Sequence, residues 1–237
     1  MNQKGKGNAL GLKTIENSIL FKDFDKESLL LIASQFIIEK WPAHTCSSCY
    51  QLRHKFHIII SGRLKVFKTD KRTGREFTLF LLRKNDFFDV ITLIEDCSHK
   101  LYYESLEDVK MLSTPILIVR RWLIKYPILN QRLLPYLGKQ LLNIEEYAVN
   151  HTLLEIPARL ASLILKNINQ ESKKLEFIND LSNEEIANLI GSTRAVVNRH
   201  FQEFKHEGIL KLGRKKMEVI NLTLLIKKAT NSKNLFN

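Results

Sequence analysis

The stretch "LSNEEIANLIGSTRAVVNRHFQEFKHEGIL", residues 181–210, has helical periodicity on both sides of a single glycine, Gly191. Apolar side chains recur there at three- and four-residue steps: Ile186, Leu189, Ile190, Val196, Val197, Phe201 and Phe204. A glycine inside a helix costs about 1 kcal/mol relative to alanine. The pattern therefore predicts two helices that meet at a turn, with Gly191 in the turn.

The residues around the glycine carry start and stop signals for both helices. Ser182 followed by Glu185 forms a capping box, in which each side chain accepts a hydrogen bond from the other residue's free amide. Gly191 suits the left-handed conformation that ends a helix. Ser192 and Thr193 then offer hydroxyl groups to cap a second helix. A tight turn between two short helices is typical of a helix-turn-helix.

The second helix carries arginines at its exposed start, where a recognition helix meets the edges of DNA bases. Arginine binds guanine through two hydrogen bonds, whereas hydroxyls and helix N-terminal amides suit phosphate. From Glu207 to Ile220, two short apolar strands flank the basic tip Gly213–Lys216, which predicts a β-hairpin wing beside the groove. The residues expected to contact DNA are Ser192, Thr193, Arg194, Ala195, Val197, Asn198, Arg199, Arg214, Lys215 and Lys216.

The charge distribution of the 237-residue chain agrees with this expectation. Its formal net charge is +12, and residues 191–237 hold ten Lys or Arg against three acids, a net +7. A basic excess at one end is expected of a surface that faces phosphate. A solvated basic tail is the alternative.

Other classes of protein find little support in the sequence. No apolar run reaches the roughly 18 residues of a membrane span, and the N-terminus lacks a signal-peptide core. Three cysteines suit a reducing compartment, so we expect a cytoplasmic protein. Phosphate-binding glycine loops, nucleophile elbows and HExxH motifs are missing, which argues against an enzyme.

The first half of the chain predicts a β domain. Residues 1–13 are interpreted as a poorly ordered basic arm, and residues 14–35 as short helices. Short apolar or alternating runs follow between turn-like segments, which is typical of a sandwich or barrel. The expected strands are residues 56–60, 64–67, 77–82, 87–94 and 115–119.

Residues 127–154 predict one long helix that begins at Pro127. At roughly 40 Å it is too long for a small domain to cover its apolar stripe, so we expect it to pair with a second copy of the chain. A helix buried within its own chain is the alternative. The residues expected at the dimer contact are Leu133, Leu137, Leu141, Ile144 and Ala148.

These motifs resemble the Crp/Fnr family of bacterial transcription regulators. Thr193-Arg194, Val197–Arg199 and Glu207–Ile209 fit the family's winged helix-turn-helix, and residues 58–68 and 85–94 fit its β-roll. The resemblance implies an α+β fold: a cupin-like β-roll sensor domain (1–126), a dimerisation helix (127–154) and a DNA-binding domain (155–237). It also implies a homodimer on palindromic double-stranded DNA and a transcription activator that contacts RNA polymerase, although the residues themselves leave the sign of regulation open.

The sequence departs from the family pattern at positions that matter for ligand and DNA. Cyclic-AMP-binding members have Gly-Glu where this chain has Asp89-Val90, and an arginine then Ser or Thr where it has His99-Lys100. Because a phosphate clamp and a ribose acceptor are lost, we expect no cyclic AMP binding. Many members have glutamate where this chain has Ala195, so its half-site should differ from theirs.

The cysteines leave the effector open. Cys46 and Cys49 have the spacing of a metal or redox pair, and His44, Cys97 and His99 could complete a metal site. Three cysteines exclude an all-cysteine four-ligand cluster within one chain. A reversible Cys46–Cys49 disulfide, a mixed Cys/His metal site and two ordinary reduced thiols all stay open, as does a ligand-binding module without a DNA function.

Overall fold

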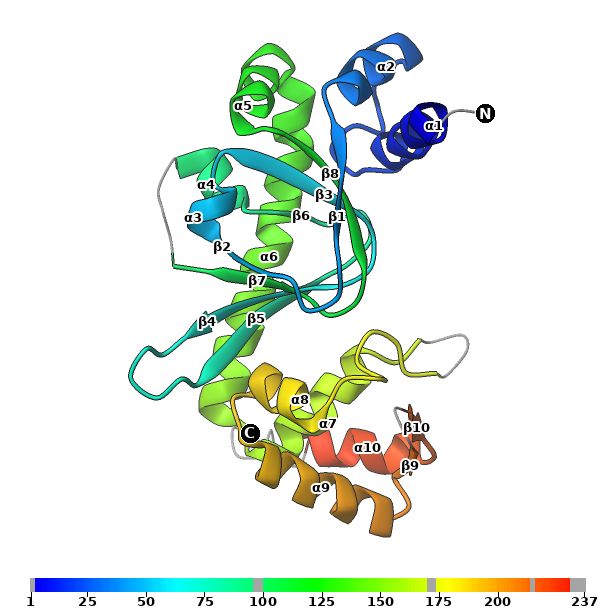
Figure 1. Ribbon diagram of the computed structural model, residues 1–237. Coiled ribbons are helices and arrows are strands. Elements are labelled where there is room, and N and C mark those ends of the chain that lie inside the picture. The colour runs from blue at the N-terminus through cyan, green and yellow to red at the C-terminus, as the bar shows by residue number, and fades with distance from the viewer. Residues whose placement is uncertain (1–2, 96–99, 170–173, 214–215, 231–237) are drawn as a thin grey trace. The chain divides into compact units, whose positions relative to one another are not determined.

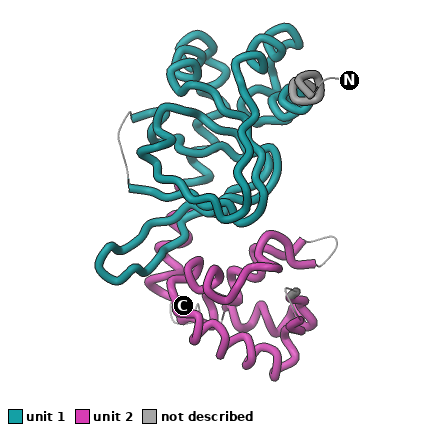
Figure 2. Tube along the Cα trace, in the orientation of Figure 1, with its two compact units in different colours: residues 1–140 teal, residues 141–237 magenta. Residues whose placement is uncertain are grey.

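The computed structural model describes residues 3–95, 100–169, 174–213 and 216–230. The chain divides into two compact units, residues 1–140 and 141–237, which Figure 2 colours separately. The long helix α6 (Pro127–Leu153) contributes to both. The α+β class is confirmed: a β-sheet domain comes first, a long helix follows, and a helical unit with a small hairpin ends the chain (Figure 1).

Unit 1 contains two antiparallel four-stranded sheets. The first has the order β1 (Ile37–Trp41), β8 (Val109–Pro115), β3 (Lys55–Ser61) and β6 (Phe87–Phe88). The second has the order β2 (Cys46–Ser48), β7 (Tyr102–Ser105), β4 (Leu64–Thr69) and β5 (Glu76–Leu82). Ile59 and Met111 from one sheet and Leu64 and Tyr103 from the other belong to one buried cluster, which is therefore the core between the sheets.

Helices cover the outer face of the first sheet. They are α1 (Gln3–Glu16), α2 (Lys26–Ser34), α5 (Ile116–Lys125) and the first half of α6. Along β3, Phe56 and Ile58 pack against these helices, whereas Ile59 faces the other sheet. Because both faces of the strand are buried, four of the five residues 56–60 are apolar, and His57 is the exception. The short helices α3 (Cys49–Leu52) and α4 (Val90–Glu95) complete the unit.

The structure corrects three expectations for unit 1. The stretch 87–94 is a strand only at Phe87–Phe88, because Asp89 takes a positive φ of 62° and helix α4 follows. In the stretch 115–119, Pro115 ends β8 and residues 116–119 begin α5, whose Ile116 and Val119 are buried on one helical face. A short apolar run does not distinguish a strand from a helix.

The third correction concerns the expected N-terminal arm, which forms helix α1 instead. Ile15 is fully buried in the core, and Leu12 packs against that core. The two residues lie three apart and therefore share one side of the helix. Apolar packing therefore anchors the C-terminal end of α1.

Unit 2 holds the end of α6, then α7 (Ile156–Lys166), α8 (Asn183–Ile190), α9 (Arg194–His206), the hairpin strands β9 (Leu210–Gly213) and β10 (Lys216–Val219), and α10 (Leu222–Thr230). Helix α10 packs on α7, and α8 packs on α9 (Figure 1). Within the ranges described, no helix has the length and apolarity that a membrane crossing requires.

Candidate nucleic-acid interface

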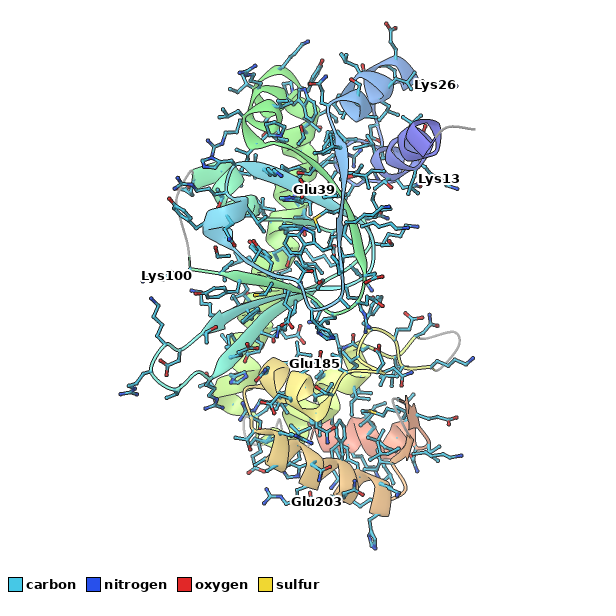
Figure 3. The ribbon with its side chains drawn as sticks, viewed as in Figure 1. Lys13, Lys26, Glu39, Lys100, Glu185 and Glu203 are labelled. Carbon is cyan, nitrogen blue, oxygen red and sulfur yellow. The ribbon has the colours of Figure 1, made fainter. Side chains whose placement is uncertain are left out.

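Helix α8 begins at the capping box that the sequence predicts. Glu185 N–H donates to Ser182 Oγ at 3.2 Å, and Ser182 N–H donates to Glu185 Oε2 at 2.6 Å. Glu185 lies at the start of α8 in Figure 3. The helix then buries Ile186, Ala187 and Ile190. The box fixes where α8 starts, and therefore where the following turn lies.

The turn after α8 is held by two features of Gly191. Its φ of 61° and ψ of 47° confirm the left-handed conformation, and its N–H and that of Ser192 donate to Ala187 O. A Cβ built on Gly191 would overlap the His151 ring, with Nε2 only 2.7 Å away. Sequence patterns give the first reason for glycine here but not the second, because His151 lies forty residues earlier in the chain.

Helix α9 presents a polar face at its start. Thr193 is the N-cap and accepts from Val196 N–H at 3.4 Å, which confirms the expected hydroxyl cap. The opposite side is buried through Val197, His200, Phe201 and Phe204. The exposed residues of the leading turns are Thr193, Arg194, Ala195, Asn198 and Arg199, which we name the leading face of α9.

Two residues expected at the DNA contact lie elsewhere. Val197 is fully buried on the inner side of α9, and Ser192 is buried with its hydroxyl unpaired. Neither side chain reaches the leading face in this conformation. The sequence pattern placed them there because they sit among exposed neighbours, but a helix turns by about 100° per residue and points Val197 inward.

The leading face is partly held by neighbouring polar groups. Asn183 Nδ2 donates to Asn198 Oδ1 at 3.1 Å, so α8 orients a side chain on α9. Arg199 lies 3.7 Å from Glu203 across one turn, and His200 Nδ1 lies 2.6 Å from Glu203. The His200 contact, followed by Arg199, lowers the pKa of Glu203, which Figure 3 shows on α9. Among the residues described, no acidic side chain pairs with Arg194.

The hairpin after α9 has the strands expected of a wing. Strands β9 and β10 pair antiparallel, and Met217 N–H donates to Asn179 Oδ1 at 2.6 Å. Leu210 and Met217 are buried, so the hairpin is anchored to the unit. Arg214 and Lys215, expected at the wing tip, lie outside the described residues, and Lys216 is described only as the first residue of β10.

Asp89 and Val90, which align with the Gly-Glu of cyclic-AMP-binding members, contact other residues of this chain. Asp89 is buried, and its carboxylate accepts from Thr92 Oγ1 at 2.6 Å and from Cys49 Sγ at 3.2 Å. Val90 packs into the apolar core. Burial raises the pKa of Tyr103, and the nearby Asp89 raises it further. His99 lies outside the described residues, while Lys100 is exposed and labelled in Figure 3.

The candidate sensor cysteines do not share one environment. Cys46 is exposed on β2, whereas Cys49 is buried beside Asp89, and the two are not joined by a disulfide. Partial burial raises the pKa of Cys46, and Glu104 adds to the effect. His44 lies 3.8 Å from Glu104, and Cys97 lies outside the described residues. Within the described ranges, no three His, Cys, Asp or Glu side chains are arranged to hold a metal ion.

Along α6 the apolar residues divide into two sets. Leu133 is buried in the core of unit 1, so it is not accessible to a second chain, whereas Leu137 packs against that core and is only partly buried. This corrects the expected dimer contact at Leu133, and the contact at Leu137 stays a prediction. The exposed apolar residues of the helix are Leu134, Leu141, Leu142, Ile144, Ala148, Val149 and Leu153, which we name the α6 stripe.

The chain is similar to characterised regulators over most of its length. Residues 158–227 match the Crp-like helix-turn-helix domain. A CRP-like cAMP-activated global transcriptional regulator of Mycobacterium tuberculosis is 24% identical over 215 residues, 89% of this chain and 96% of the relative. A global nitrogen regulator of Synechococcus elongatus is 26% identical over 217 residues, 87% and 94% of the two chains.

A solved structure extends the similarity to the fold. The crystal structure of a Crp/Fnr-family protein from Eubacterium rectale superposes with a TM-score of 0.70 at 19% identity. The match covers 89% of this chain and 97% of that one. At this identity the comparison shows a shared fold.

Proposed function

Because this chain belongs to the Crp/Fnr family of transcription regulators, we propose that it binds palindromic double-stranded DNA as a homodimer, through α9. The carrying observation is the leading face of α9, which projects polar and basic side chains directly after a capped glycine turn. Transcription regulators of this family are not enzymes. A DNA partner implies the cytoplasm as the location.

The side chains of the leading face suit two kinds of contact, one with base edges and one with phosphate. Arg194 is exposed and without an acidic partner among the described residues, so its guanidinium suits a guanine edge. Ala195 offers only apolar contact, which suits a thymine methyl. Thr193 and the free amides at the start of α9 suit phosphate. Asn198 and Arg199 add contacts one turn further along, and Arg214, Lys215 and Lys216 of the wing suit the DNA backbone.

The α6 stripe supports the proposed homodimer. Leu141 and Leu142 are 67% and 64% exposed, and both lie on the part of α6 that belongs to unit 2. Adjacent exposed leucines on a long helix favour pairing with the same helix of a second copy. Pairing would place two recognition helices on successive major grooves, roughly 34 Å apart.

Cyclic AMP is not the effector in this proposal. The Asp89 carboxylate already accepts hydrogen bonds from Cys49 and Thr92, and Val90 is an apolar core residue. A ribose would therefore lack an acceptor at this position. Titration calorimetry with cyclic AMP tests this, and tight stoichiometric binding would overturn it. A metal or redox role for Cys46 and Cys49 gains no support from their separate environments.

RNA polymerase is the proposed protein partner, by analogy with regulators of this family. A run-off transcription assay with purified polymerase and a selected promoter site tests both the contact and the sign of regulation.

The DNA contact is tested with a site selected by the protein from a random duplex library. Arg194→Ala should weaken binding to that site by about 1–3 kcal/mol per half-site and relax its base preference. Lys205→Ala is the matched control. Lys205 is exposed, and its replacement removes the same charge about 16 Å further along α9. Unchanged site preference in the Arg194 variant would contradict the assignment of the recognition face.

A further inference from the structure

His151, in the last turn of α6, joins that helix to the helix-turn-helix. Its ring stacks on Tyr147, with centroids 4.3 Å apart, and its Nε2 is hydrogen-bonded to the Tyr147 hydroxyl. Its Nδ1 lies 3.0 Å from Arg159 Nη1, and the same Nη1 donates to Ile190 O at 3.0 Å. One guanidinium nitrogen therefore connects His151 to the last carbonyl of α8.

The His151 ring also packs directly against the turn between α8 and α9. A Cβ on Gly191 would overlap His151 Cε1, so the glycine backbone rests directly on the imidazole. All these residues belong to unit 2. The end of the proposed dimerisation helix, the start of α7 and the turn before the recognition helix thus meet at one side chain.

The hydrogen bonds of His151 require its imidazole to be neutral. Arginine has only donors, so His151 Nδ1 must accept and cannot carry a proton. Nε2 then carries the hydrogen and donates to the Tyr147 oxygen. The groups that face the ring include Tyr147 from α6 and Arg159 from α7, and the turn contributes Ile190 and Gly191, which are uncharged. A proton on Nδ1 would turn this acceptor into a donor. It would also place the positive charge of the imidazolium 3.0 Å from that of the Arg159 guanidinium.

We propose that His151 is a positioning residue for DNA binding, whose neutral imidazole holds the turn between α8 and α9 against the end of α6. Protonation of His151 releases the Arg159 link and lets α9 move relative to the dimerisation helix. DNA affinity then falls in acid. This inference rests on the proposed DNA-binding function. His206 is exposed in the last turn of α9, outside the turn that His151 supports, and therefore serves as the control histidine.

The test compares the native full-length chain with His151→Asn and with a control, His206→Asn. Asparagine keeps an acceptor oxygen near the place of Nδ1 and never becomes charged. Affinity for the selected duplex is measured by fluorescence anisotropy at pH 7.5 and 5.5. Between these values native protein should lose about fivefold more affinity than His151→Asn, the equivalent of one ordinary hydrogen bond. His206→Asn should lose at least as much as native.

A second readout does not depend on DNA. Hydrogen exchange of peptides from 183–206, corrected for intrinsic rates, should show the native turn opening more at pH 5.5, and His151→Asn should not. Arg159→Met, which removes the opposing charge, should also flatten the acid response. Equal acid responses of native and His151→Asn in both assays would overturn the positioning role. An acid-sensitive turn in a protein that selects no DNA would instead overturn the proposed function.

Discussion

Replacing Gly191 with alanine probes two separate demands that the helix-turn-helix makes on one residue. At φ 61° and ψ 47°, an L side chain costs about 1–2 kcal/mol. The lower entropy of an unfolded alanine offsets about 0.4–1 kcal/mol of this. The backbone alone therefore predicts a loss of about 1 kcal/mol in the stability of unit 2.

The second demand comes from the imidazole of His151. The alanine Cβ would overlap Cε1 and lie 2.7 Å from Nε2, so either the ring or the turn must shift. Inserting a methyl group into a packed site costs about 1–3 kcal/mol. Gly191→Ala should therefore lose about 2–4 kcal/mol in the native background but only about 1 kcal/mol beside His151→Ala, a coupling of about 1–3 kcal/mol.

The assay must report on unit 2 alone. Hydrogen exchange of peptides from 183–206 gives the opening free energy of α8 and α9. Trp41 and Trp122 both lie in unit 1, so urea unfolding followed by tryptophan fluorescence is the internal control and should not change. Equal costs in both backgrounds, within about 0.5 kcal/mol, would refute the His151 contact. A cost near zero in both would also refute the left-handed turn.

Two further predictions concern the dimer and unit 1. Leu141→Glu should raise the dimer dissociation constant about a hundredfold or more, since each chain loses the burial of one leucine; sedimentation velocity measures this. Asn143→Glu, which adds the same charge where Lys166 Nζ lies 3.3 Å away, should leave the dimer intact, and equal effects would contradict the α6 stripe. In unit 1, His57 and then Lys55 lower the pKa of Glu39 from 4.5 to about 2, so Glu39 stabilises the fold above pH 4.5 and this contribution is lost as the pH falls towards 2. Glu39→Gln should flatten that part of the pH profile of urea stability, and an unchanged profile would count against the Glu39 contacts with Lys55 Nζ at 2.6 Å and His57 Nε2 at 3.8 Å.

The local chemistry of the helix-turn-helix was readable in the sequence. The Ser182–Glu185 box, the glycine turn and the Thr193 cap each depend on residues within four positions of one another. Their spacing alone carries the geometry. The strands at 56–60, 64–67 and 77–82 were predictable for a similar reason, because apolar runs between turn signals indicate strands.

The directions of the side chains were less readable. Val197 belongs to the helix that the sequence predicts and shares its buried side with Phe201 and Phe204, so helical spacing already favours an inward direction. Leu133 fits the predicted stripe by spacing, yet it is buried in the core of unit 1, whereas its neighbour Leu134 is exposed. Periodicity defines a stripe, but the partner that covers it is set by the rest of the chain.

The sequence by itself determined the two helices, their caps, the turn and the basic end of the chain, because these depend on short-range hydrogen bonds and on composition. Only the tertiary structure decided what lies against that turn. His151 and Arg159 reach Gly191 and Ile190 across more than thirty residues, and Cys49 reaches Asp89 across forty. Contacts of this range leave no spacing signal, because the folded core, and not the local chain, brings their atoms together.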